Sequence, residues 1–176
     1  SGQVRVYQYS NSSWNQLGAD IDGEYENDQS GFSVSLSSDG TIVAIGAIEN
    51  DDNGSDSGHV RVYQYSNSNS SWNQLGADID GEANKDYSGA SVSLSDDGFT
   101  VAIGATVNNG NGKDSGQVRV YQYSNSMWSQ LGSDIDGEYG GDNSGKSVSL
   151  SSDGLTVAIG APYNDCLLYT SPSPRD

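Results

Sequence analysis

One segment occurs three times in this chain, in nearly the same letters, at residues 30–47, 88–105 and 144–161. In its first copy Val34 and Leu36 alternate with serines, which is typical of a half-buried strand. Asp39-Gly40 is a dipeptide that favours a two-residue hairpin turn, and the apolar residues 42–45 follow it. Each copy therefore predicts two antiparallel strands joined by a tight turn.

A second motif, Gly-x-Val-Arg-Val-Tyr, begins at Gly2, Gly58 and Gly116, so its spacings are 58 − 2 = 56 and 116 − 58 = 58 residues. This period is long for a helical repeat and suits a four-stranded blade with its loops. Around the motif, residues 1–24 predict a strand over 4–9 and a second strand from Trp14 to about Ile21. The order along the chain is hairpin, loop, hairpin, loop.

The whole pattern resembles the FG-GAP repeat of integrin α-chain β-propellers. It consists of serine-glycine, an aromatic or small residue, serine-valine, a turn and then Val-Ala-Ile-Gly-Ala. The resemblance covers residues 1–165. It implies an all-β fold of propeller blades, each with four antiparallel strands. It also implies an extracellular scaffold for adhesion, which binds a protein or glycan ligand through loops on one face.

The repeats divide residues 1–165 into blades and parts of blades. We expect a half blade at 1–24, whole blades at 30–82 and 88–138, and a half blade at 144–163. Because propellers close with 4–8 blades, this number predicts an open arc, a fragment of a larger propeller, with uncovered ends.

The composition changes abruptly after Asp165. Residues 166–176 contain Cys166 and a Ser-Pro-Ser-Pro run and match no part of the repeat. We interpret them as a non-repeat tail, either an unstructured linker or a sequence derived from a cloning adapter, and exclude them from the fold prediction.

The net charge of the sequence limits the classes of molecule that it is expected to bind. Seven basic and 24 acidic residues give a net charge of −17, which argues against binding nucleic acid or anionic lipid and favours cations. The sequence has no transmembrane run, and its single cysteine permits no internal disulfide. Asn-x-Ser triplets at Asn11, Asn53 and Asn69 are compatible with a glycosylated surface, so we expect an extracellular or cell-surface ectodomain.

Calcium is the cofactor that the resemblance suggests, but the sequence departs from the family here. In integrin-type repeats an aspartate-rich loop between the first two strands of a blade holds the ion. The equivalent connection in this chain is only Ser38-Asp39-Gly40 or its counterparts, which is too short to supply the six to eight oxygens that calcium takes. The family's calcium residues are therefore not carried over.

A different acidic motif offers an alternative metal site in each repeat. Asp-x-Asp-Gly-Glu with a later aspartate places two carboxylates on one side of a strand end, and its glycine permits a turn that brings the others round. Hard oxygen ligands suit calcium, although the spacing differs from the EF-hand pattern, and a solvated acidic turn is the competing interpretation. The candidate ligands are Asp20, Asp22, Glu24 and Asp28; Asp78, Asp80, Glu82 and Asp86; and Asp134, Asp136, Glu138 and Asp142.

The loops that differ between repeats are candidates for ligand contact or plain surface. Residues 49–56 are strongly acidic, whereas their counterparts at 108–114 have lost most of that charge. Variable loops on a repeated scaffold usually carry specificity.

Two rival functions concern aromatic and catalytic residues. Trp14, Trp72 and Trp128 occupy one equivalent position; they would be buried if they pack between blades and exposed if they stack on sugars in a lectin-like propeller. His59 is the only histidine, and the sequence has neither a nucleophile-elbow motif nor a cysteine–histidine pair. We therefore expect no catalysis; a propeller enzyme acting on glycans would need two carboxylates that face each other across a cleft.

Overall fold

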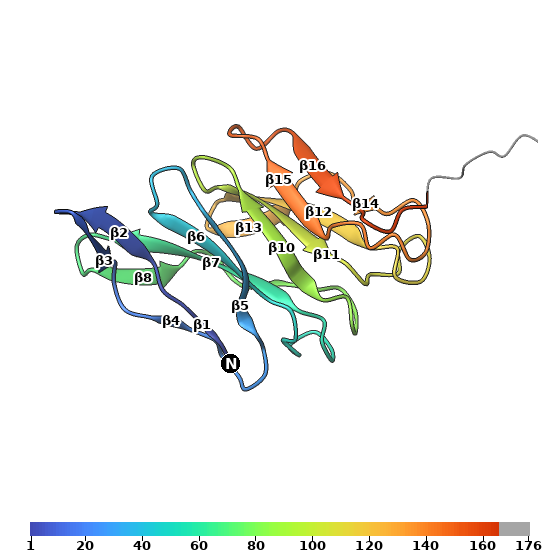
Figure 1. Ribbon diagram of the computed structural model, residues 1–176, viewed down its shortest axis with the longest axis horizontal. Coiled ribbons are helices and arrows are strands. Elements are labelled where there is room, and N and C mark those ends of the chain that lie inside the picture. The colour runs from blue at the N-terminus through green and yellow to red at the C-terminus, as the bar shows by residue number, and fades with distance from the viewer. Residues whose placement is uncertain (166–176) are drawn as a thin grey trace, which may run out of the picture.

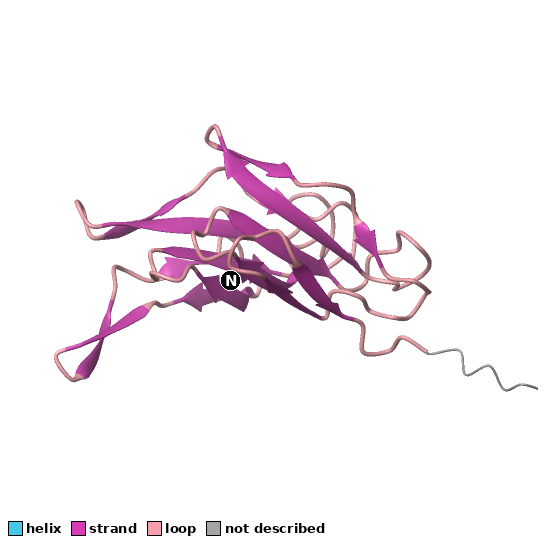
Figure 2. Cartoon of the chain, turned by 90° about the horizontal axis from the view of Figure 1, so that it is seen from above, coloured by secondary structure: helices cyan, strands magenta, loops and turns pink. Residues whose placement is uncertain are grey.

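The computed structural model describes residues 1–165, which form strands and loops only (Figure 2). The predicted tail at 166–176 lies outside these residues. Within the part described, no helix is present that could cross a membrane.

Two central sheets have the same antiparallel order. The first contains β5 (Ser30–Leu36), β6 (Ile42–Ala47), β7 (His59–Ser66) and β8 (Ser71–Gln74), with β9 (Ile79–Asp80) also paired to β7. The second contains β10 (Ser88–Leu94), β11 (Thr100–Ala105), β12 (Gln117–Ser124) and β13 (Met127–Gln130), with β14 (Ile135–Asp136) paired to β12. These sheets confirm the prediction of four-stranded antiparallel blades.

Incomplete sheets flank the two blades. On one side lie the outer strands β1 (Gln3–Val4), β2 (Tyr7–Ser10), β3 (Ser13–Gln16) and β4 (Ile21–Asp22), and on the other the inner strands β15 (Ser147–Leu150) and β16 (Val157–Gly160). Figure 1 shows the sheets side by side in chain order, with the two incomplete sheets at opposite ends. The sheets form an open arc and do not close into a ring, as expected.

The predicted outer strand from Trp14 to Ile21 is wrong in one respect, because it is interrupted in every repeat. In the first whole blade β8 and β9 both pair with β7, and residues 75–78 leave the sheet between them. Gly76 has a φ of +79°, and a Cβ there would lie 2.8 Å from the indole of Trp128. The tryptophan of the next blade therefore packs at the interruption, where only a glycine leaves room for it.

The expected two-residue hairpin turn is also wrong. The Ser37 amide donates to the Ile42 carbonyl at 2.9 Å, which leaves four residues in the loop. The Asp39 carboxylate accepts hydrogen bonds from the Thr41 amide at 2.9 Å and the Ser37 hydroxyl at 2.8 Å. The Asp39 carboxylate thus gives hydrogen-bond partners to donors of the longer turn, including a backbone amide that a two-residue turn would have paired with a backbone carbonyl.

Serines of the inner strands join one blade to the next. The Ser33 hydroxyl donates to the Gly89 carbonyl at 2.7 Å, and the Ser35 hydroxyl accepts from the Leu94 amide at 3.0 Å. Leu94 packs in the core between the two whole blades, whereas the equivalent Leu36 in the first blade is exposed. An inner strand therefore contacts a neighbouring blade through both of its faces, by serine hydrogen bonds and by apolar packing.

The tryptophans also lie between blades. The Trp72 indole donates to the Leu17 carbonyl at 2.7 Å, and the Trp128 indole donates to the Leu75 carbonyl at 2.6 Å. Trp14 is 68% exposed, since no blade precedes it in the structure. The interblade role expected of this position is confirmed where a preceding sheet is present.

Candidate functional site

All the long loops lie at one end of the blades, because successive strands reverse direction (Figure 1). We call this end the loop face; it comprises residues 23–29, 48–57, 81–87, 106–115, 137–146 and 161–165. Neighbouring loops bond to each other, as where the Lys85 amide donates to the Ser55 carbonyl at 2.8 Å and the Asn53 amide side chain donates to the Gly81 carbonyl at 2.7 Å. The short turns, residues 37–41, 66–70, 95–99, 125–126 and 151–155, form the opposite turn end.

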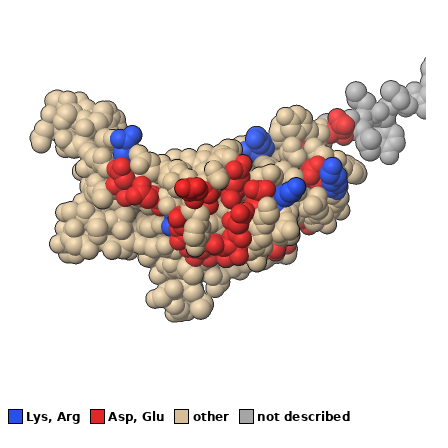
Figure 3. Space-filling model, turned by 90° about the horizontal axis from the view of Figure 1, so that it is seen from below, with Lys and Arg blue, Asp and Glu red and all other residues tan. Residues whose placement is uncertain are grey.

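Acidic side chains gather on the loop face. Figure 3 views the molecule from this side and shows Asp and Glu side chains grouped over its centre, with a few Lys and Arg side chains around them. The individual carboxylates of the predicted metal motifs lie here or beside it, and they have different neighbours.

The first aspartate of each motif accepts a hydrogen bond from a glutamine four residues earlier. The Gln16 side chain donates to Asp20 at 2.6 Å and Gln130 donates to Asp134 at 2.7 Å, while Gln74 donates to Asp78 in the same way. These carboxylates therefore help to shape the interruption in the outer strand.

The last aspartate of each motif is buried and holds two loops together. Asp86 accepts from the Ala83 amide at 3.0 Å and from the Asn108 side chain at 3.0 Å. Equivalent bonds join Asp28 to Tyr25 and Asn50, and Asp142 to Tyr139 and Asn164. A carboxylate in this position stabilises the loop by accepting amide hydrogen bonds.

The glutamate of the motif pairs with an arginine of the next blade. Arg61 lies 3.4 Å from Glu24, and Arg119 lies 3.5 Å from Glu82. Each arginine also donates to a backbone carbonyl in the preceding sheet, that of Asp22 or Asp80. Asp22, Asp136 and Glu138 are exposed, and Glu138 accepts a long hydrogen bond of 3.5 Å from Asn164.

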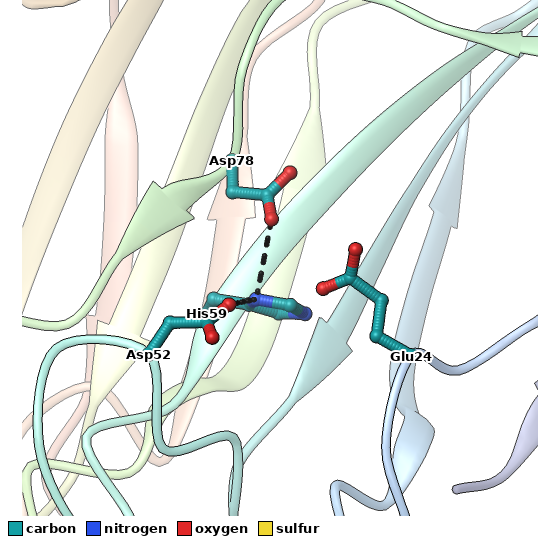
Figure 4. Close-up of side chains that lie close together, drawn as sticks. All are labelled: Glu24, Asp52, His59 and Asp78. Carbon is teal, nitrogen blue, oxygen red and sulfur yellow. Dashed lines mark ion pairs between the residues drawn. The ribbon is translucent and has the colours of Figure 1, made fainter.

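The structure does not gather the four carboxylates of any one motif around a common point. Among residues 1–165 it brings together one group of potential metal ligands, Glu24, Asp52, His59 and Asp78, whose ligand atoms lie within 4.8 Å of one another. Figure 4 shows the carboxylates of Asp52 and Asp78 directed at one nitrogen of His59, with Glu24 approaching the ring from the other side. The group thus combines residues of two motifs with two that the motif does not contain.

His59 is the buried member of this group. It begins β7, its side chain is 1% exposed, and its Nδ1 atom has no hydrogen-bond partner. Nδ1 lies 3.8 Å from an Asp52 oxygen and 3.7 Å from an Asp78 oxygen, too far for a hydrogen bond to either.

Residues 20–63, from the residue before β4 into β7, match the model of the FG-GAP repeat. This stretch of the chain is similar to an FG-GAP repeat. The matched stretch recurs in the second blade, so the same unit accounts for most of the described residues.

Solved structures support the propeller-like fold of this chain. It resembles a protein of Bacteroides fragilis described as a candidate 6-phosphogluconolactonase, with a TM-score of 0.56 and 10% identity over 90% of this chain and 36% of that one. A similarly described protein of Bacteroides uniformis gives a TM-score of 0.54 and 12% identity over 90% and 37%. The chain thus spans about a third of the length of these structures. No curated protein has a significant match.

Sequence reasoning about the FG-GAP repeats missed His59 and Asp52 as members of a site. The available signal was a difference between copies, because Gln117 and Gly110 occupy the equivalent positions in the next repeat. Those differences fall at a place where motifs of two repeats meet, beside Glu24 and Asp78.

Asp80 lies beside this group, and its surroundings disfavour the ionised form of its carboxyl group. It is the strand partner of His59, and its Oδ1 atom is buried without a hydrogen-bond partner. Burial raises the pKa of the Asp80 carboxyl, and the negative charge of Asp78 raises it further, whereas His59 and Arg119 act in the opposite direction. Asp80 thus places a carboxylate with an unpartnered oxygen next to this group.

Proposed function

We propose that this protein is a non-catalytic extracellular scaffold for adhesion or ligand binding, and that its ligand contacts the loop face. The observation that carries the proposal is the difference between the strands and the long loops of each blade. Strands that are almost identical between repeats are bonded from blade to blade, whereas the loops that differ are collected at one end. Rigid scaffolds with variable loops are a common basis for recognition.

The charge of the loop face favours a basic protein surface as the ligand. A net charge of −17 attracts cationic partners, and the grouped carboxylates concentrate that attraction on this face. A glycan remains the second ligand class, but Trp72 and Trp128 give it no support because they are used between blades.

A non-catalytic role agrees with how the carboxylates of the motifs are used. Eight of the twelve accept hydrogen bonds from glutamines, hold loops together or pair with arginines. The likeness to candidate lactonases at 10–12% identity concerns the fold and gives no support for that activity in this chain.

An extracellular location is part of the proposal. The FG-GAP repeat is typical of ectodomains, and the triplets at Asn11 and Asn69 lie in exposed turns, where a glycan could be attached.

The proposal is tested by binding measurements with the full chain and two probes, an oligolysine peptide and a printed glycan array. Two charge reversals are compared, Glu26→Lys on the loop face and Asp96→Lys at the turn end. Both positions are exposed, and each substitution changes the net charge equally.

We expect Glu26→Lys to weaken peptide binding by about threefold or more at low ionic strength, and Asp96→Lys to change it far less. Equal effects of the two substitutions would show a general charge effect and contradict the loop face as the contact surface. Binding to glycans alone, unaffected by Glu26→Lys, would support the lectin-like alternative.

A further inference from the structure

We propose that Glu24, Asp52, His59 and Asp78 form a binding site for a divalent transition-metal ion such as Zn²⁺. The site lies between the first incomplete sheet, which supplies Glu24, and the first whole blade, which supplies the other three residues. The proposal is independent of the ligand that the loop face binds.

The first argument is the unpartnered nitrogen of His59. A buried polar atom without a hydrogen bond costs free energy, so such atoms are nearly always paired with protein, water or an ion. Nδ1 of His59 faces the carboxylates of Asp52 and Asp78, yet no hydrogen bond reaches it. A metal ion between Nδ1 and the carboxylates would give this nitrogen a partner.

The second argument is the type of ligand. Calcium and magnesium take oxygen ligands, whereas an imidazole with carboxylates suits zinc and other first-row transition metals. The group offers one imidazole nitrogen and three carboxylates, and this number of ligands equals the four that zinc takes in proteins. The ion class therefore differs from the calcium that the sequence motif suggested.

The third argument is that the group can contract around an ion. Donor atoms around a tetrahedral zinc ion lie about 3.3 Å apart, so the group, now within 4.8 Å, must close slightly. The Asp52 and Glu24 side chains are 40% and 35% exposed and free to move, while His59 is fixed by burial in β7. Arg61, which is paired with Glu24, would orient that carboxylate.

The next blade interface provides an internal comparison. Glu82 and Asp134 occupy the positions of Glu24 and Asp78, but Gln117 replaces the histidine and Gly110 replaces Asp52. The Gln117 side chain donates to Glu82 at 3.2 Å, which satisfies the glutamate without an ion. A histidine in place of the glutamine and an aspartate in place of the glycine thus replace a glutamine–glutamate hydrogen bond with a group of potential metal ligands.

The test is isothermal titration calorimetry of the full chain with Zn²⁺, Mn²⁺ and Ca²⁺ after removal of metals with a chelator. The key variant is His59→Gln, which introduces the residue that the fold already accepts at position 117. Glu26→Gln removes an acidic loop residue outside the group and serves as the control. Circular dichroism and thermal melts show whether each variant is folded.

We expect the wild type to bind one Zn²⁺ per chain, more tightly than Ca²⁺, with a raised melting temperature. His59→Gln should weaken this binding by about 100-fold while Glu26→Gln leaves it unchanged. Absence of saturable Zn²⁺ binding in folded wild-type protein would overturn the proposal, as would Zn²⁺ binding that His59→Gln does not weaken.

Discussion

Aspartates of this chain differ in function according to their hydrogen-bond partners. Asp39 and Asp153 lie in turns, where hydrogen bonds to their carboxylates lower their pKa. Asp86 is buried but receives two hydrogen bonds from its loops. Asp80 is the contrasting case, since burial raises its pKa and one oxygen has no partner.

Replacing Asp80 by asparagine should therefore stabilise the metal-free protein at neutral pH. A pKa above the usual 3.8 in the folded state means that stability falls as pH rises from 3.8 through the folded pKa, and at about pH 7 the full penalty applies. Asp80→Asn removes this penalty, so its advantage over wild type should be greatest near neutrality and shrink below the folded pKa. Urea denaturation at several pH values measures the difference; a variant less stable than wild type at about pH 7 would contradict it.

Strands of this fold are held to the next blade by close backbone contact as well as by apolar packing. Gly46 and Gly104 occupy equivalent positions in β6 and β11, and the carbonyl groups of Gly89 and Gly145 in the following sheet lie against them. Gly160 is the equivalent residue in β16, where no following sheet is present.

Gly104→Ala should accordingly destabilise the protein while Gly160→Ala should have little effect. The added methyl group on Gly104 would collide with the Gly145 backbone, which we expect to cost about 1–3 kcal/mol in free energy of unfolding. The methyl group on Gly160 would meet only the Ser147 side chain, which can rotate away. Chemical denaturation compares the two variants, and equal losses would contradict the interface assigned to Gly104.

The strands could be predicted from the sequence because alternation and turn residues are local signals. Val34 and Leu36 indicated β5, and the apolar run at 42–45 indicated β6. What could not be predicted depends on a second blade. A serine such as Ser33 has the same local pattern whether it faces water or donates to Gly89. The residue that packs at the break at 75–78, Trp128, likewise comes from the next repeat.

The candidate site was only partly predictable for a related reason. Glu24 and Asp78 were recognised as potential ligands, but each was assigned to the carboxylates of its own motif. Their proximity arises from the stacking of two sheets, and the roles of Asp52 and His59 follow from that stacking. The later aspartates, such as Asp86, were assigned to a metal without knowledge of the loop asparagine that bonds to them.

At the scale of the whole molecule, the arc separates two kinds of surface. The turn end consists of short loops, of which those at 37–41, 95–99 and 151–155 are similar in every repeat. The loop face contains the variable long loops and most of the grouped negative charge (Figure 3). The first whole blade exposes the apolar residues Val34 and Leu36 of β5, whose equivalents Val92 and Leu94 pack against the preceding blade. We therefore expect ligand recognition on the loop face.

The most direct test of this account is a map of ligand contact by NMR. The ¹⁵N-labelled full chain would be titrated with the oligolysine peptide, and the amide chemical-shift changes assigned by residue. The account predicts that the changes concentrate at residues 23–29, 48–57, 81–87 and 106–115 and are nearly absent from residues 37–41, 95–99 and 151–155. Changes centred on those turn-end residues, or a bound peptide that leaves the loop face unchanged, would contradict it.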